Sequence, residues 1–267
     1  MKDYGPRRIV CLTEETTETL YLLGQQHRIV GISGYTVRPP QARREKPKVS
    51  AFTSANLDMI LELQPDLVLG FSDLQADMAA DLIRRGIAVH VFNQRGIDGI
   101  LSMMVTLGSM VGEREKALEW VAGFEARRAR LESEKRQAIQ SPRIYFEEWD
   151  EPIISGIRWV SELIELAGGT DCFADLASQS LAKDRIVADP MAVVRRQPDI
   201  IIGSWCGKRF RPEKVAAREG WDQLPAVLNQ QLHEIKSPLI LQPGPAALTD
   251  GLDALLSIVA QWRATQP

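Results

Sequence analysis

A short acidic cluster and one cysteine are the side chains in this chain that could do chemistry. Glu147, Glu148 and Asp150 stand close together, and Cys206 lies in a polar, aromatic stretch. Paired carboxylates can act as general acid and base, and a loop cysteine can act as a nucleophile. However, no base lies near Cys206 in the sequence, and adjacent acidic residues are often only solvated. We expect a binding protein, and an enzyme that uses these groups is the alternative.

The known signatures of catalytic and metal sites are missing from the sequence. It contains no H-E-x-x-H, G-x-S-x-G, P-loop or G-x-G-x-x-G motif. The three histidines are scattered, and the three cysteines form no C-x-x-C pair. We therefore expect no catalytic residues, no metal ligands and no covalent cofactor.

Composition excludes other classes of protein. The chain has 267 residues and a formal net charge of −3, and no basic stripe predicts nucleic acid binding. No segment approaches the roughly 18 apolar residues that span a membrane. The first residues show neither a hydrophobic signal core nor a cleavage site. The sequence as given thus indicates a cytoplasmic protein or one whose leader is missing.

One long segment, residues 113–140, would have to position everything else. It contains no proline and a single glycine, and its apolar residues recur every three or four positions. They are Ala117, Leu118, Trp120, Val121, Phe124 and Leu131. We expect one unbroken amphipathic helix that joins two lobes as their only connection, with this stripe packed against both. An ordinary surface helix on a single large domain is the alternative.

Strand and helix patterns alternate on both sides of that segment. Aliphatic runs at residues 8–12, 28–33, 67–70 and 198–203 read as buried strands of a parallel sheet. Residues 147–158 read as a loop, and Pro225 as a break in a short helix. Residues 63–70 and 196–203 share the pattern Gln-Pro-Asp, three aliphatic residues and Gly. In both, a strand would lead into a loop at the edge where α/β sheets bind ligands.

The order of these segments resembles the substrate-binding proteins of ABC importers for cobalamin, iron-siderophores and haem. The resemblance covers nearly the whole chain. Its motifs are Thr17-Glu18, Leu23-Gly24, Ile29-Val30-Gly31, Ser33-Gly34-Tyr35, Pro39-Pro40, Asn56-Leu57-Asp58, residues 63–68, Ser161-Glu162-Leu163, residues 167–170 and Phe173-Ala174-Asp175. The acidic residues 147–150 and the Pro243-Gly244-Pro245 turn depart from the family pattern, and no secretion leader or lipobox is visible.

The resemblance implies an α/β fold with two Rossmann-like lobes joined by one long rigid helix. It predicts an N-terminal lobe at residues 1–112, the connecting helix at 113–140 and a C-terminal lobe at 141–267. The ligand would lie in a cleft between the lobes. The protein would capture a small molecule for an ABC importer permease dimer and act as a monomer in the periplasm. The missing leader leaves a cytoplasmic location open.

Site residues are expected in the loops that end the strands. The ligand-binding candidates are Glu14, Glu15, Tyr35, Phe52, Phe71, Trp149, Trp205 and Phe210. Their aromatic rings suit a wide, flat, partly polar ligand, and we favour a corrinoid, cobalamin. An iron-siderophore or haem is the alternative, for which Lys208, Arg209 and Arg211 could offset negative charge. Core packing is the other role open to Phe52 and Phe71.

Two pairs of acidic residues each have two possible roles. Glu14 and Glu15 could cap a helix or accept hydrogen bonds from ligand amides. Related binding proteins dock to the permease through one exposed carboxylate on each lobe. The counterparts here are Asp77 and Glu213, for which a solvated surface position is the other reading.

Overall fold

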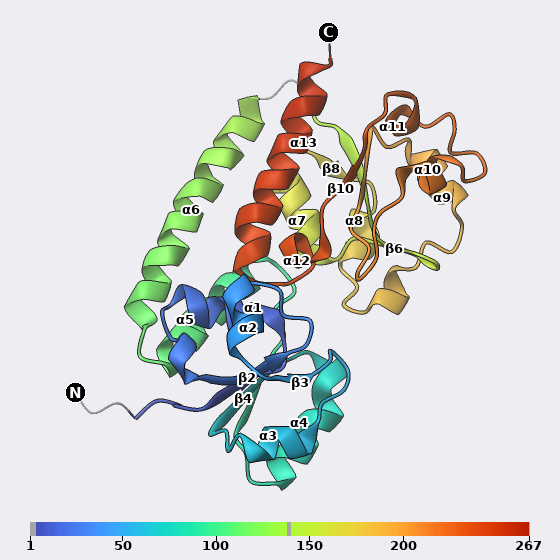
Figure 1. The fold of residues 1–267 in the computed structure, drawn as a ribbon. Helices are drawn as coiled ribbons and strands as arrows, with labels where there is room; N and C mark the ends of the chain where they lie inside the picture. Colours follow the sequence, from blue (N-terminus) through green and yellow to red (C-terminus); the bar gives the residue numbers. More distant parts are fainter. Residues whose placement is uncertain (1–3, 138–139, 267) are drawn as a thin grey trace. The chain divides into compact units, whose positions relative to one another are not determined.

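The protein divides into two compact α/β units (Figure 1). A computed structural model describes residues 4–137 and 140–266. Unit 1 comprises Met1–Gln94 and Asp98–Gly123, and unit 2 comprises Arg95–Ile97 and Phe124–Pro267. Each unit has its own five-stranded sheet. The predicted α/β class with two lobes is therefore confirmed.

Unit 1 is built on a parallel sheet with the strand order β3-β2-β1-β4-β5. Its strands are β1 (Ile9–Cys11), β2 (Ile29–Ser33), β3 (Lys48–Ser50), β4 (Leu67–Phe71) and β5 (Val89–Phe92). Both β1 and β4 are buried along their whole length. This explains their uninterrupted aliphatic sequences, because helices cover both faces of a parallel sheet.

The helices of unit 1 follow the strands in regular alternation. They are α1 (Glu14–Leu22), α2 (Pro40–Glu45), α3 (Leu57–Glu62), α4 (Ala76–Arg84) and α5 (Ile97–Met110), with 3-10 turns at Gln26–Arg28 and Asp73–Gln75. Asn56 caps α3, since its side chain accepts a hydrogen bond from the Met59 N–H. Helices α1 and α5 share a face of the sheet, and the Thr19 hydroxyl contacts Met103 Sδ. In Figure 1, α3 and α4 lie on the opposite face.

Unit 2 has the strand order β10-β9-β6-β7, and β8 also pairs with β6. Its strands are β6 (Arg143–Asp150), β7 (Ile153–Ser155), β8 (Thr170–Asp171), β9 (Ile200–Gly203) and β10 (Leu232–Glu234). All pairings are parallel except that of β6 with β7. The prediction of a loop at residues 147–158 is wrong: β6 continues to Asp150 and turns back into β7. The strand can include these acidic residues because Arg218 forms an ion pair with Glu147 and Arg185 forms one with Glu148.

The helices of unit 2 are mostly short. They are α7 (Arg158–Leu166), α8 (Ala174–Ala177), α9 (Met191–Arg196), α10 (Pro212–Ala216), α11 (Pro225–Leu228), α12 (Ser237–Ile240) and α13 (Leu252–Ala264), with a 3-10 turn at Ala182–Arg185 and a π-helical turn at Ala247–Gly251. Pro225 begins α11 instead of breaking a helix. A proline is tolerated in the first helical turn, where its missing N–H costs nothing.

Helix α6 (Arg114–Gln137) is the long segment that the sequence predicts, and the boundary between the units falls inside it. It is shorter than residues 113–140, and residues 138 and 139 of that prediction lie outside the described residues. Its buried side chains are Ala117, Phe124 and Leu131, each seven residues apart, whereas Leu118 is exposed. The buried stripe is thus narrower than expected. None of the helices described here has the length and apolar character of a membrane span.

A second short segment of chain also leaves unit 1. Arg95–Ile97 belong to unit 2, although the residues on either side belong to unit 1. The Ile97 N–H donates a hydrogen bond of 2.6 Å to Glu162 Oε2. The Glu162 carboxylate also packs against Gly96, because a Cβ at Gly96 would lie only 2.8 Å from either of its oxygens. By this division, the chain passes from unit 1 into unit 2 and back at Arg95–Ile97. The expectation that the long helix is the only connection between the lobes is therefore wrong.

The Gln-Pro-Asp pattern builds the same junction in both units. Asp66 Oδ1 accepts a hydrogen bond of 2.9 Å from the backbone N–H of Arg8, and Asp199 Oδ2 accepts one of 2.8 Å from that of Arg143. The glutamine before each proline has a positive φ, 44° in unit 1 and 47° in unit 2. In each unit, the aspartate therefore fixes the start of one strand against the start of its neighbour.

Two glycines near α6 give opposite predictions for stability. Gly123 lies inside α6 and Gly112 precedes it with a φ of +79°, and neither would place a Cβ within 4 Å of another atom. Gly123→Ala should stabilise the protein by about 0.5–1 kcal/mol by lowering backbone freedom in the unfolded chain. Gly112→Ala should destabilise it by about 1–2 kcal/mol through left-handed strain. Urea unfolding of both variants tests this, and shifts of the same sign would contradict it.

Candidate functional site

The carboxyl edge of the unit 1 sheet gathers the predicted site residues of that unit. Glu14 and Glu15 follow β1, Tyr35 follows β2, Phe52 follows β3 and Phe71 ends β4. All five strands are parallel, so these residues meet at one edge. The chain reverses its direction across the sheet between β1 and β4, the position at which α/β sheets bind ligands.

Tyr35 presents the most open aromatic surface at this edge. Its side chain is 58 % exposed. The residues on either side are fixed from α2, because Arg43 Nη1 donates to the carbonyl oxygens of Gly34 at 2.7 Å and Thr36 at 3.3 Å. The tyrosine therefore stands on a clamped loop with its ring in solvent, as a ligand contact requires.

Phe52 and Phe71 are tied to one buried amide. Gln75 Nε2 donates to the Phe52 carbonyl at 2.8 Å, and Gln75 Oε1 accepts from the Phe71 N–H at 2.9 Å. Gln75 is 2 % exposed and Phe71 is 5 % exposed, whereas Phe52 is only partly buried. Phe52 thus keeps some accessible surface, whereas Phe71 is a core residue.

Glu14 and Glu15 begin α1 and are both buried. Thr13 Oγ1 donates a hydrogen bond of 2.6 Å to Glu15 Oε1. Burial raises the pKa of Glu15 to about 8 and also raises the pKa of Glu14. Glu15 is 1 % exposed, so its carboxyl group is protonated at neutral pH and faces the protein interior.

The buried carboxyl of Glu15 predicts a specific pH dependence of stability. Its folded pKa of about 8 lies above its ordinary value of 4.5, so the unfolded chain releases a proton that the folded chain keeps. This contribution to stability is complete below the ordinary pKa and is lost as the pH rises through the folded pKa. The wild type should lose up to about 1.4 kcal/mol per pH unit in this window relative to Glu15→Gln.

Urea unfolding of the wild type and of Glu15→Gln between about pH 5 and about pH 8 measures the difference. Glu62→Gln changes an exposed carboxylate of the same unit and serves as the control. If the free energies of unfolding of wild type and Glu15→Gln run parallel across this range, the assignment of a neutral buried Glu15 is wrong.

Trp205 and Phe210 belong to the loop that leaves β9 in unit 2. Trp205 is 4 % exposed and its Nε1 donates to Glu147 Oε1 at 3.0 Å. The Phe210 ring packs edge-on against Trp205, with centroids 5.0 Å apart, and covers Gly203 so closely that a Cβ there would lie 1.9 Å from a ring carbon. Phe210 is 3 % exposed and therefore supports Trp205 from the core.

The acidic cluster that could have done catalysis is neutralised by partners. Glu147 is fully buried and accepts two hydrogen bonds from the Arg218 guanidinium, at 2.5 and 2.8 Å, and one from the Tyr145 hydroxyl at 2.9 Å. Glu148 pairs with Arg185 Nη1 at 2.6 Å. These contacts are structural, since each carboxylate is committed to a cation. The burial of Tyr145 next to Glu147 raises the pKa of its hydroxyl.

The last acid of the cluster reaches the loop after β9. Asp150 forms an ion pair with Lys208. The Lys208 ammonium lies over the Trp149 ring, 4.0 Å from its centroid, and 5.2 Å from that of Trp205. The Trp149 indole also donates to the Glu151 carbonyl at 2.8 Å. Trp149, Trp205 and Lys208 thus form one connected group at the carboxyl edge of unit 2.

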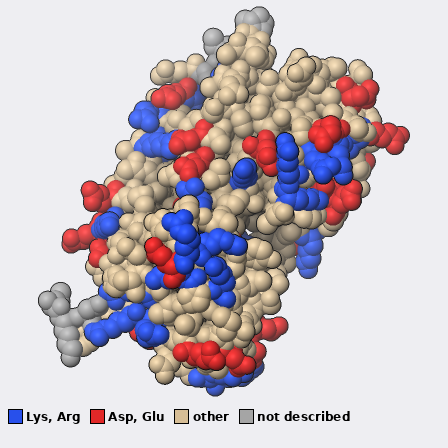
Figure 2. All heavy atoms as spheres, in the orientation of Figure 1, with Lys and Arg blue, Asp and Glu red and all other residues tan. Residues whose placement is uncertain are grey.

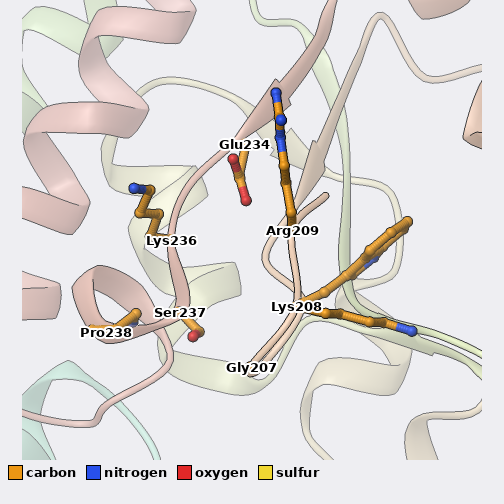
Figure 3. A pocket seen from close by; sticks show the side chains of 8 residues that line it. Gly207, Lys208, Arg209, Glu234, Lys236, Ser237 and Pro238 are labelled. Atoms are coloured by element: carbon orange, nitrogen blue, oxygen red, sulfur yellow. The ribbon is translucent and has the colours of Figure 1, made fainter. Parts of the chain in front are cut away.

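A hollow of about 610 Å³ opens at the carboxyl ends of β9 and β10 (Figure 3). We call it the edge pocket. It is lined by Trp205, Gly207, Lys208, Arg209, Glu234, Lys236, Ser237 and Pro238. In Figure 3, Glu234 lies between Arg209 and Lys236, and Lys208 extends toward the opposite side. Three cations and one carboxylate give the pocket an excess of positive charge.

A second hollow of about 690 Å³ flanks the β6–β7 turn of the same unit. Its walls are mostly apolar, with Ile153, Val187 and Met191 among them, and Asp150, Glu151 and Glu219 bring negative charge. Asp150 lines this hollow while its partner Lys208 lines the edge pocket. The two hollows therefore share one ion pair.

The remaining candidates, Asp77, Glu213 and Cys206, are not among the residues that line these hollows. Asp77 is exposed in the first turn of α4, and Glu213 is exposed in the first turn of α10. Charges of both signs are interspersed on the face of the molecule drawn in Figure 2. Cys206 is exposed, whereas burial raises the pKa of the Cys11 and Cys172 thiols to about 12. The described residues contain no cluster of histidine, cysteine and acidic side chains that could hold a metal ion.

Sequence reasoning missed Lys236, Ser237 and Glu234 as lining residues. The signal was the end of β10, since this strand ends at Glu234 and the other two residues follow it within three positions. The residues that follow a parallel strand are the natural place to look. Gln75 and Arg218 were missed because their roles come from contacts far away in sequence.

The chain belongs to the periplasmic binding protein family, which it matches over residues 9–239. It is 27 % identical to the vitamin B12-binding protein of Vibrio cholerae over 257 residues, which cover 92 % of this chain and 87 % of the relative. It is 23 % identical over 260 residues to YvrC of Bacillus subtilis, an uncharacterized ABC transporter substrate-binding lipoprotein, with 94 % and 79 % covered.

Solved structures share the fold. The periplasmic vitamin B12 binding protein BtuF of Vibrio cholerae superposes with a TM-score of 0.77 at 23 % identity, covering 98 % of this chain and 99 % of that one. The periplasmic heme-binding protein RhuT of Roseiflexus sp. RS-1 gives a TM-score of 0.78 at 21 % identity, covering 96 % and 100 %. At this identity, the likeness defines the architecture of the chain.

Proposed function

We propose that this protein is a substrate-binding protein that captures a corrinoid, cobalamin, and delivers it to the permease dimer of an ABC importer. The observation that carries the proposal is the edge pocket, which the largely buried Trp205 lines together with polar and cationic side chains. Such a surface suits a wide ligand with an apolar face and a polar periphery. Its similarity to vitamin B12-binding proteins of Vibrio species supports the same ligand.

A second candidate is an acidic metal chelate, a ferric siderophore or haem. The three cations of the edge pocket favour it, and some proteins of the same fold are described as heme-binding. However, Asp150 offsets one of these cations, Lys208. The remaining positive charge is small for a multiply charged chelate, so we favour the corrinoid.

An enzyme that acts at this edge is the weaker reading. Glu147, Glu148 and Asp150 are each paired with a cation, which leaves none of the three as an unengaged general base. We propose that the protein binds its ligand reversibly and changes no covalent bond. Recovery of unaltered ligand after prolonged incubation is the corresponding measurement, and a modified ligand would argue for an enzyme.

Titration with cobalamin, a ferric siderophore and haem tests the ligand. Cobalamin should bind with a dissociation constant below about 10 μM, equivalent to about −7 kcal/mol, and more tightly than the other two. Tyr35→Ala should weaken cobalamin binding about tenfold, since truncating an exposed aromatic contact typically costs more than about 1 kcal/mol. Calorimetry and absorbance report both quantities.

Tyr4→Ala is the matched control for Tyr35→Ala. Tyr4 is 84 % exposed and lies at the opposite, amino edge of unit 1, where it lines a hollow with Asp66 and His90. Its removal should leave the affinity for cobalamin unchanged. Tighter binding of haem or a siderophore than of cobalamin would replace the corrinoid assignment, and absence of binding by all three would count against the proposal as a whole.

Docking to the permease is proposed to use Asp77 and Glu213, one exposed carboxylate on each unit. The double variant Asp77→Ala/Glu213→Ala should lower uptake in transport assays at least about tenfold, because truncating a charged partner at an interface slows association and weakens the complex. Its ligand affinity should equal that of the wild type. Normal uptake by this variant would show that docking uses other residues.

The control for docking is Glu62→Ala/Asp222→Ala, which removes one exposed carboxylate from each unit at other positions. It should transport like the wild type. A loss of uptake equal to that of Asp77→Ala/Glu213→Ala would point to total charge as the cause.

We propose that the protein works as a monomer in the periplasm, and a cytoplasmic corrinoid-binding protein of the same fold is the alternative. The family description supports the first location. Cell fractionation distinguishes the two, since co-purification with a cytoplasmic marker would favour the second. Sedimentation at micromolar concentration tests the monomer, and a stable dimer would contradict it.

A further inference from the structure

The charged side chains that line the edge pocket, counted together with Asp150, leave a surplus of about one positive charge. Lys208 is offset by Asp150, and Glu234 stands against Arg209 and Lys236. In the part of the chain that the structure describes, Arg209 and Lys236 form no ion pair. Figure 3 shows Glu234 between them. A pocket with this balance attracts an anion more than a neutral group.

The backbone that carries these side chains is held in place before any ligand arrives. Trp205 is bonded to Glu147, and the Phe210 N–H donates to Glu234 Oε1 at 3.1 Å. This second bond occupies one oxygen of Glu234 and joins the loop after β9 to the end of β10. Little conformational entropy is therefore lost in ordering this loop when a ligand binds, so weak charge contacts can contribute to affinity.

We infer that the edge pocket binds the phosphodiester of a corrinoid that carries its nucleotide, with Arg209 and Lys236 as its cationic partners and Ser237 as a hydroxyl donor. A phosphodiester has one negative charge at neutral pH, which the surplus positive charge of the pocket attracts. Cationic side chains and hydroxyls are common partners of phosphate oxygens. The inference rests on the proposed function for the identity of the ligand, and it makes these residues determinants of specificity for complete corrinoids.

The test compares cobalamin with cobinamide, which has the corrin ring but lacks the nucleotide and its phosphate. Arg209→Met/Lys236→Met should weaken cobalamin binding about tenfold, which is the effect of losing two charge-assisted contacts at an exposed site. Cobinamide affinity should change less than about twofold. The wild type should prefer cobalamin, and the double variant should lose most of that preference.

Lys183→Met/Lys214→Met is the control, because it removes two exposed lysines of unit 2 that do not line the edge pocket. It should bind both corrinoids like the wild type. An equal loss for cobalamin in this control would assign the effect to total charge and overturn the inference. Equal losses for cobalamin and cobinamide in Arg209→Met/Lys236→Met would also overturn it, because the lost contact would then be to the corrin ring.

A separate measurement keeps the inference distinct from the proposed function. Dimethyl phosphate, a small phosphodiester, is titrated into the labelled protein, and amide chemical shifts of Gly207, Arg209 and Ser237 are followed. Saturable shifts in the wild type that vanish in Arg209→Met/Lys236→Met support the anion site even if no corrinoid binds. Absence of these shifts overturns the site, while tight cobalamin binding by the wild type would still uphold the proposed function. If the double variant loses haem affinity but not cobalamin affinity, the phosphodiester is the wrong anion.

Discussion

The buried carboxylate of Glu147 is the group on which the carboxyl edge of unit 2 depends. It has no exposed surface, so protein donors must replace the water that would otherwise solvate its charge. Arg218, Tyr145 and Trp205 supply four hydrogen bonds from three separate parts of the chain. Losing one partner of such a buried pair typically costs about 3–5 kcal/mol. The same carboxylate therefore stabilises the unit and fixes the orientation of the Trp205 indole.

The sequence predicted most of the strands because the sheets are parallel and buried. Runs such as Leu67–Phe71 and Ile200–Gly203 have no polar alternation, and both are strands. The extension of β6 through its acidic residues could not be predicted. Its compensating cations, Arg185 and Arg218, lie 37 and 71 residues away from the acids they pair with. Local sequence carries no information about such pairs, so an acidic run reads as a loop.

The place of the site was easier to predict than the role of each side chain. Parallel strands bring their carboxyl ends to one edge, and this alone located Tyr35, Phe52 and Trp205. Whether a ring is exposed depends on packing: Tyr35 is 58 % exposed, whereas Trp205, which packs edge-on against Phe210, is 4 % exposed. Glu15 shows the same limit, since its position suggested a ligand contact and its burial turns it inward. The cations at the end of β10 escaped notice because that strand is only three residues long.

Because of the repeated Gln-Pro-Asp junction, the two ends of each sheet have different roles. Asp66 and Asp199 set strand register at the amino ends, through backbone N–H groups that every residue except proline supplies. The loops at the carboxyl ends take no part in that alignment. At an exposed position there, such as Tyr35, a mutation can exchange an aromatic ring for a charge without altering this alignment. Ligand preference can therefore diverge while the framework stays intact. Such an arrangement allows proteins of one architecture to bind different metal chelates.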